Sequence, residues 1–436
     1  MKKLTAWILI LCFLLTAASC GKPAAEISVT ETTEEPVPET TLPETEPPTT
    51  APPEPQEFML TFVGDCTFGS DPGLVSSTGS FVNTVGSDYG YPFRNIIQYF
   101  EDDDFTMVNL EGVLGEKGYR VPKTFNFQGS EEYVRILTEN SVEAVTLANN
   151  HSYDYGQPGY EETKRILMEA EMPYVERDAS CLVTTHSGLK VGLYAAQFDV
   201  DLEDLSTEVA QLRQQGAEIV VFAIHWGSEG YYKPHLHQCQ QAYDAIDAGV
   251  DIVYGSHPHV LQKIEEYNGG IIFYSLGNFS FGGNHFPKDM DTVIVQQQVI
   301  RDIDGSVRLG DLAVVPCSLS SIPVQNNFQP TPYPQDHPGY ERVMSKLDGS
   351  WNGSNLSINY APIIPEGTTP PATNPTVPPE TTVPPATEAP TAPPATEAPT
   401  APPATETPTA PPATEAPAVT PPATEAPAQP PSGGDA

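Results

Sequence analysis

Short apolar runs alternate with segments of helical spacing through the middle of the chain. Runs bounded by polar residues predict strands at 58–63, 105–110, 142–148, 190–196, 218–224 and 251–254. Apolar residues at helical spacing predict helices at 92–103, 131–140, 158–171, 202–215 and 237–248. Beyond residue 260 the pattern becomes rich in strands, at 270–275, 292–300 and 307–315. Strands that alternate with helices predict a largely parallel α/β sheet, and the later strands predict a second sheet packed against it.

The two ends of the chain differ in composition from this middle part. Residues 21–57 and 362–436 consist almost wholly of Pro, Thr, Glu and Ala, which bury too little apolar surface to offset chain entropy. We therefore expect disordered Pro/Thr/Glu-rich linkers at both ends, the second a repeat tail of extended polyproline character. The stretch 58–361, about 300 residues, is long enough for one large core.

Residues 1–20 resemble an export signal. Lys2 and Lys3 precede an apolar run that is shorter than the roughly 20 residues of a membrane-spanning helix. Ser19 and Cys20 resemble the lipobox of bacterial lipoproteins, in which Cys20 becomes an acylated N-terminus, although Ala17 stands where that pattern usually has Leu. The sequence thus predicts a protein anchored by lipid at the extracellular face of the bacterial membrane, with simple cleavage and secretion as the alternative.

The net charge limits the classes of possible partner, and the cysteine spacing limits the possible disulfides. The net charge is −37, and residues 58–361 alone carry 40 acidic and 17 basic residues, a balance of −23. A nucleic-acid binder needs a basic surface, so nucleic acid is excluded as a partner. The cysteines of this stretch form no CxxC pair, and we expect small core residues or free thiols, with one disulfide left open: Cys66, Cys181, Cys239 and Cys317.

Polar side chains follow the predicted strands, where the ligand crevice of an open α/β sheet lies. The candidates are Asp65, Glu111, Asn150, His151, His225, His257 and His259. Carboxylate, amide and imidazole donors together suit Mn²⁺, Zn²⁺ or Fe better than Ca²⁺ or a thiolate-bound metal. Without His151, the six remaining ligands suit a two-ion site better than one tetrahedral zinc, and two ions support hydrolysis of a phosphoester or a related bond.

These residues lie in short blocks that resemble the signature of the CapA family, the poly-γ-glutamate capsule biosynthesis proteins. The blocks are Gly64–Asp65, Asn109–Gly112, Leu147–His151, His225–Gly227, Gly255–His259 and Tyr274–Phe279, all within 58–285. The resemblance implies a metallophosphoesterase-like two-sheet sandwich flanked by helices. It also implies a role in making, exporting or retaining an extracellular polymer, with poly-γ-glutamate or other capsule material as a partner beside a membrane synthetase complex.

The resemblance also implies roles for the candidate residues. Asp65 matches the first metal-binding Asp, Glu111 the bridging carboxylate, and His151 the general acid. The remaining metal ligands are Asn150, His225, His257 and His259. Thr67 stands where such proteins commonly have a His, so either one or two ions are expected.

Four further residues are predicted to contact substrate or to support the ligands. Lys123 precedes a Phe-Asn-Phe block that the family shares, and Trp226 is either a core residue or a substrate platform. Glu229 is expected to orient a ligated imidazole, and Asn278 to support a loop near the pocket.

Three functions remain open from the sequence. The first is a CapA-like protein with a metal-dependent hydrolase site, the second a non-catalytic scaffold or polymer-binding subunit, and the third a surface adhesin or wall-spanning protein. A domain at −23 does not attract polyglutamate over long range, so such binding must depend on local metal charge or a basic groove.

Overall fold

The computed structural model describes residues 54–75, 78–323 and 325–353. The predicted leader with Cys20, nearly all of the first linker and the repeat tail lie outside these ranges. The first strand, β1 (Gln56–Thr67), begins two residues before the predicted start at 58, and the last helix, α8, ends at Leu347.

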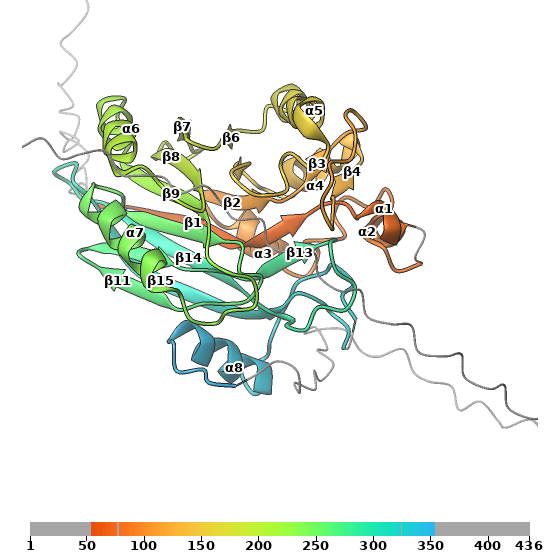
Figure 1. Cartoon of the computed structure of the whole chain (residues 1–436). Coiled ribbons are helices and arrows are strands. Elements are labelled where there is room, and N and C mark those ends of the chain that lie inside the picture. The colour runs from red at the N-terminus through yellow and green to blue at the C-terminus, as the bar shows by residue number, and fades with distance from the viewer. Residues whose placement is uncertain (1–53, 76–77, 324, 354–436) are drawn as a thin grey trace, which may run out of the picture. The chain divides into compact units, whose positions relative to one another are not determined.

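Two large sheets pack face to face (Figure 1). The first has the order β16-β15-β14-β1-β2-β5-β6, with β13 also pairing β1. Its other strands are β2 (Phe105–Leu110), β5 (Ala144–Thr146), β6 (Tyr174–Val175), β13 (Asn278–Phe281), β14 (Asp291–Arg301), β15 (Val307–Ser318) and β16 (Thr331–Pro332). The second has the order β11-β12-β10-β9-β8-β7. Its strands are β7 (Ala179–Thr184), β8 (Lys190–Gln197), β9 (Ile219–His225), β10 (Ile252–Ser256), β11 (Ile264–Tyr267) and β12 (Gly270–Phe273). A short pair is formed by β3 (Val113–Leu114) and β4 (Gln128–Gly129).

The division of the strands between the sheets corrects the sequence prediction. The late strands were expected to form the second sheet, but β14 pairs antiparallel with β1, from Gln56↔Arg301 to Val63↔Ile294, and so extends the first. The second sheet is built instead around the parallel mid-chain strands β8, β9, β10 and β12. Apolar patterning shows that a segment is a strand, but the partner is chosen by which faces can be buried together.

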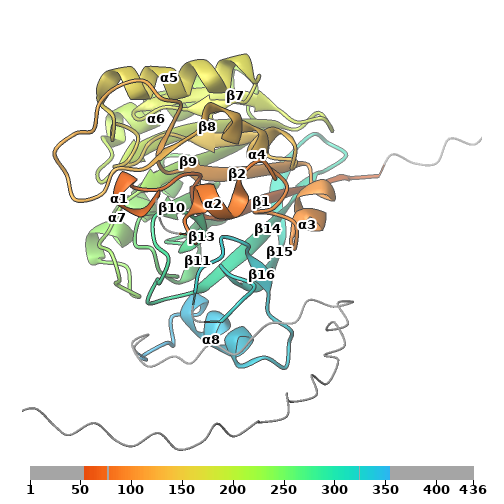
Figure 2. The same ribbon diagram turned by 90° about the vertical axis from the view of Figure 1, so that its right-hand side faces the viewer.

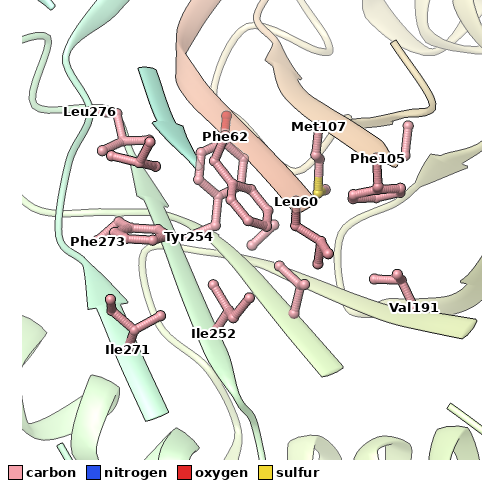
Figure 3. Close-up of a cluster of buried hydrophobic side chains, with 14 of the residues drawn as sticks. Leu60, Phe62, Phe105, Met107, Val191, Ile252, Tyr254, Ile271, Phe273 and Leu276 are labelled. Carbon is pink, nitrogen blue, oxygen red and sulfur yellow. The ribbon is translucent and has the colours of Figure 1, made fainter. Parts of the chain in front are cut away.

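The main core lies between the two sheets. From the first sheet, Leu60 and Phe62 of β1 and Phe105 and Met107 of β2 point into it, at alternating positions along each strand (Figure 3). From the second sheet it receives Val191, Ile252, Tyr254, Ile271 and Phe273. Tyr254 also ties the sheets together, since its hydroxyl donates to Val63 O at 2.7 Å and accepts from Asn109 N at 3.0 Å.

Helices cover the outer faces of both sheets (Figure 2). The first sheet is covered by α2 (Phe81–Val85), α3 (Ile97–Glu101), α4 (Val134–Thr138) and α5 (Gly156–Glu169). The second is covered by α6 (Leu202–Gln214) and α7 (Leu236–Asp247). The remaining helices are α1 (Pro72–Val75), the 3₁₀ turn η1 (Glu131–Tyr133) and α8 (Pro338–Leu347). The predicted two-sheet α/β sandwich flanked by helices is therefore confirmed.

The structure also tests the predictions for the helix at 92–103 and for the cysteines. The helix expected at 92–103 begins only at Ile97, because turns occupy the residues before it. Cys66, Cys181, Cys239 and Cys317 are all free thiols, and Cys66 and Cys317 are buried. Within the described ranges no helix is both long enough and apolar enough to cross a bilayer.

Candidate metal centre

The carboxyl ends of parallel strands from both sheets bring the predicted ligands together. Glu111 directly follows β2, His225 is the last residue of β9, and His257 and His259 follow β10. Asp65 comes from the far end of β1, beside them. Residues up to 194 positions apart in sequence therefore share one edge of the sandwich, as the rule for open α/β sheets predicts.

Asp65 lies within a strand and not in a loop after it. The sequence predicted that β1 ends at Val63, but β1 continues to Thr67 because β13 pairs with it, Asp65 opposite Asn278. Gly64 permits this close approach, since a Cβ there would lie 2.2 Å from Gly277 O. Asp65 N donates to Gly277 O at 2.8 Å, and Asp65 Oδ1 accepts from Asn109 Nδ2 at 2.9 Å. These contacts leave Asp65 Oδ2 facing the histidines.

Glu111 stands at the middle of the cluster. Its Oε1 lies 3.8 Å from His151 Nε2, 4.0 Å from His225 Nε2 and 3.9 Å from His259 Nε2. The side chain is fully buried, and neither of its oxygens accepts a hydrogen bond from any residue that the structure describes. Burial, reinforced by the charge of Asp65, raises the pKa of Glu111 to about 8. A buried carboxylate without a donor is costly unless a cation completes its surroundings.

One half of the cluster combines Glu111 with an amide and an imidazole. His225 Nε2 lies 2.9 Å from Asn150 Oδ1, while its Nδ1 lies 2.9 Å from Ser256 Oγ, which fixes the ring. Burial and the neighbouring His257 lower the pKa of His225 well below its usual value. The ring is therefore neutral, which is the form that ligates a metal.

The other half is formed by Asp65 and the two histidines around Pro258. His259 Nδ1 lies 3.2 Å from Asp65 Oδ2 and 2.9 Å from Asn278 Oδ1. His257 Nδ1 is buried and has no hydrogen-bond partner among the described residues. His257 and His259 have φ angles of 95° and 55°, a left-handed region that non-glycine residues seldom occupy and that clusters at functional sites.

The donors present fit a divalent metal ion. Ligand atoms of Asp65, Glu111 and His259 lie within 4.8 Å of one another, as do those of Glu229, His257 and His259. The unsatisfied carboxylate of Glu111 lies where both halves meet, as expected of a shared ligand. Thr67 is buried, and its hydroxyl has no hydrogen-bond partner among the described residues. Because Thr67 has no imidazole, the half that contains Asp65 has one imidazole fewer than the resemblance implies. Oxygen and nitrogen donors without thiolates favour Mn, Zn or Fe.

His151 is held beside the centre by an acid that the sequence analysis missed. His151 Nδ1 lies 2.7 Å from Asp154 Oδ2, which also accepts from Phe127 N at 2.6 Å. Burial lowers the pKa of His151, and the charge of Asp154 opposes that fall. Lys123 reaches the same acid, with Nζ at 2.7 Å from Asp154 Oδ1 and 3.0 Å from Asn150 O. Lys123 therefore supports the His151–Asp154 pair, and the close spacing of that pair along the chain was the available signal.

The other supporting residues have mixed outcomes. Trp226 is fully buried, with its indole donating to Tyr274 O at 2.9 Å, so of the two alternatives the structure supports the core residue and not the substrate platform. Asn278 contacts His259 directly, and exposed Glu229 lies within reach of the imidazoles. Asn109 and Ser256, not singled out from the sequence, orient Asp65 and His225 from the ends of β2 and β10. Each lies within two positions of a predicted ligand, which could have drawn attention to both.

Comparison with known proteins places this chain in a family. Residues 59–283 match the family described as "Bacterial capsule synthesis protein PGA_cap". The chain is 31% identical over 296 residues to "Capsule biosynthesis protein CapA" of Bacillus anthracis, covering 61% of this chain and 68% of that protein. It is 30% identical to "PGA biosynthesis protein CapA" of Bacillus subtilis, covering 56% and 68%.

The protein is thus an α/β two-sheet protein with a carboxylate–imidazole centre. The chain belongs to the bacterial capsule synthesis protein family PGA_cap. It is also 27% identical to "Probable polyglutamine synthesis accessory protein Rv0574c" of Mycobacterium tuberculosis, covering 44% of this chain and 60% of that protein. Among solved structures it is similar to TT1561 of Thermus thermophilus, with 12% identity and a TM-score of 0.30, covering 59% of this chain and 99% of that one. At that score the similarity supports no argument.

Proposed function

We propose that this protein is exported, held at the outer face of the bacterial membrane through a lipid on Cys20, and acts in the synthesis, export or retention of a capsule polymer through a metal-dependent hydrolase site. Membership of the capsule synthesis family supports the role, and the names of the relatives support poly-γ-glutamate as the polymer. A membrane synthetase complex is the partner that such a role requires.

The unsatisfied carboxylate of Glu111 carries the proposal of a metal site. Three imidazoles converge on this oxygen at 3.8–4.0 Å, and no Lys or Arg pairs with it in the part of the chain that the structure describes. Asp65, Glu111, Asn150, His225, His257 and His259 would hold a divalent metal, which would supply Lewis acidity and lower the pKa of bound water towards neutrality.

His151 is the proposed proton donor to the leaving group. Because Asp154 accepts from Nδ1, the Nε2 atom faces the centre, and Asp154 also favours the protonated ring. Glu111 and the neutral imidazoles of His225 and His257 stay ligands, since burial lowers the pKa of both rings.

The test uses the full mature chain. Its bound metal is measured by elemental analysis, and hydrolysis of bis(4-nitrophenyl) phosphate is followed with added Mn²⁺. Glu111→Gln should lose metal and activity, whereas Glu266→Gln, at an exposed carboxylate of β11, should keep both. A wild-type protein that binds no Mn²⁺ and stays inert removes the hydrolase proposal.

Membrane attachment needs its own test. Cys20→Ala should release the protein from the membrane fraction into the medium or leave it unprocessed. If the variant still partitions with membranes like the wild type, the lipid anchor is wrong and the secreted alternative is favoured.

One observation favours a second function, a non-catalytic polymer-binding subunit. Thr67 provides no imidazole on the Asp65 side of the centre. Under that function His151→Ala cells retain wild-type amounts of capsule, whereas under the hydrolase proposal capsule synthesis or retention changes.

A further inference from the structure

A pocket of about 700 Å³ opens beside the metal centre. Its lining includes Glu229, His259 and Asn278 of the centre, together with Phe281 and Phe286. Phe281 is buried, and its ring lies 5.0 Å from that of His259. Phe286 is 65% exposed, although large apolar side chains are usually covered. A volume of this size and an apolar wall next to a few polar groups are typical of a site for a small ligand or one segment of a polymer.

Lys288 supplies an unpaired positive charge on the wall of this pocket. Among the described residues every arginine forms an ion pair, and Lys190 and Lys288 are the two lysines whose ammonium groups make neither a hydrogen bond nor an ion pair. Lys190 lies near Glu218, at the start of β8. In an acidic domain, where nearly every cation is engaged by an acid, a free ammonium in a pocket is available to a ligand.

The neighbouring acid, Asp289, does not neutralise the charge of Lys288. Asp289 also lines the pocket, but its Oδ2 accepts from Lys346 Nζ at 2.7 Å and from the Tyr232 hydroxyl at 2.9 Å. Lys346 is buried beneath it, with 1% exposed. The pocket therefore combines an apolar surface, one free cation and a wall formed by the metal centre.

From this combination we infer that the pocket binds one repeat of a polymer that carries a single carboxylate beside an apolar stretch of its main chain, with Lys288 pairing the carboxylate and Phe286 covering the apolar stretch. This inference rests on the proposed function and names its substrate site. A γ-linked glutamyl repeat has this chemistry, because two methylene groups lie in its main chain and one free carboxylate lies next to them on the α carbon. Among the described residues the lining contains no Arg to form the bidentate pair that phosphate recognition commonly uses. One local ammonium also explains how an acidic protein binds an acidic polymer without long-range attraction.

The test measures binding of fluorescein-labelled hexa-γ-glutamate to the full chain in Mn²⁺, with His151→Ala in every variant to prevent turnover. Lys288→Met should weaken binding about fivefold, the effect of losing one partly exposed ion pair, and Lys288→Arg should restore most of it. Lys190→Met is the matched control and should bind within about twofold of its parent. Phe286→Ala should also weaken binding while the melting temperature stays unchanged.

Three outcomes overturn the inference. Lys288→Met binding like its parent removes Lys288 from the site, and equal losses in Lys288→Met and Lys190→Met show only non-specific attraction. Tighter binding of a glycerol-phosphate hexamer than of hexa-γ-glutamate would replace the carboxylate with a phosphate.

The design also separates this inference from the metal proposal. If the protein binds no Mn²⁺ but the probe still depends on Lys288, the hydrolase proposal fails and the pocket stands. If Mn²⁺ binds and Lys288→Met has no effect, only the pocket inference fails.

Discussion

Two buried pairs of acids in the described part of the chain have opposite surroundings. Asp289 and Asp291, at the start of β14, face a buried lysine, with Lys346 Nζ at 2.7 Å from an oxygen of each. Arg342 of α8 also donates to both oxygens of Asp291 at 2.6 Å. The chain itself therefore supplies the cations that this pair requires.

Asp65 and Glu111 are equally buried but receive no lysine or arginine from the described part of the chain. Asp65 Oδ1 accepts from the neutral amide of Asn109, and Glu111 has only imidazole nitrogens at 3.8–4.0 Å. A buried ion is tolerated only when it is paired and hydrogen-bonded. Burial of acids does not by itself indicate a metal site. The indication is that the fold places imidazoles around them, and no lysine or arginine from the described part of the chain.

Removing the internal cation should have the largest effect. Lys346→Met leaves Asp289 and Asp291 buried with one cation fewer, and should lower the free energy of unfolding by about 3–5 kcal/mol, measured by urea denaturation. The control Lys263→Met breaks a partly exposed pair with Glu265 and should cost less than about 1 kcal/mol. Equal losses of unfolding free energy in the two variants would mean that the buried ion pair stabilises the fold no more than a partly exposed one.

Neutralising Glu111, the buried acid of the metal centre, should have the opposite effect on the free energy of unfolding. In metal-free protein, Glu111→Gln removes an unsatisfied buried carboxylate and should leave the free energy of unfolding at pH 9 unchanged or raised, by up to about 3 kcal/mol. The same variant should bind Mn²⁺ about 100-fold more weakly or worse, by competition with a metal indicator, because a ligand is lost. A marked loss of stability in the metal-free variant would contradict the comparison.

Asp154→Asn tests whether this acid positions His151. The amide can still accept from Phe127 N but no longer favours the protonated ring. Hydrolysis of the aryl phosphodiester should fall roughly 100-fold, with bound metal unchanged and the alkaline limb of the pH profile displaced to lower pH, because the pKa of His151 falls when the charge of Asp154 is lost. If bound metal falls in parallel with the rate, Asp154 acts on the centre and not on His151.

The pH dependence of metal binding gives the smallest effect. Since the pKa of Glu111 is raised to about 8, the ion must displace a proton at lower pH. The affinity for Mn²⁺ should therefore rise by up to about tenfold per pH unit as the pH approaches 8, and Glu111→Gln should flatten this rise. In the metal-free protein the free energy of unfolding should instead fall as the pH rises through about 8, because the folded state binds the proton of Glu111 more tightly than the unfolded state does. An affinity that does not change between pH 6.5 and 8 would contradict a protonated Glu111.

Individual elements show how much of the fold could be predicted from the sequence. The strand at 105–110 matches β2 residue for residue, and α6 and α7 lie within a residue of the predicted ranges, since their apolar periodicity is strong. The two-residue β6 and the strand β13 were not predicted, because short segments give little periodicity. Trp226 was left open between core and substrate, since a large aromatic beside a ligand has the same local sequence in either place.

The sequence by itself determined the alternation of strands and helices, the donor types and the family, because these depend on local patterning and on short blocks of adjacent residues. Only the tertiary structure decided that β14 and β15 extend the first sheet, that Asp154 holds His151 and that Lys288 remains unpaired beside the centre. These facts depend on which distant residues become neighbours. A carboxylate with an internal cation and one without look the same along the chain, and differ only once the fold has placed a lysine beside one of them.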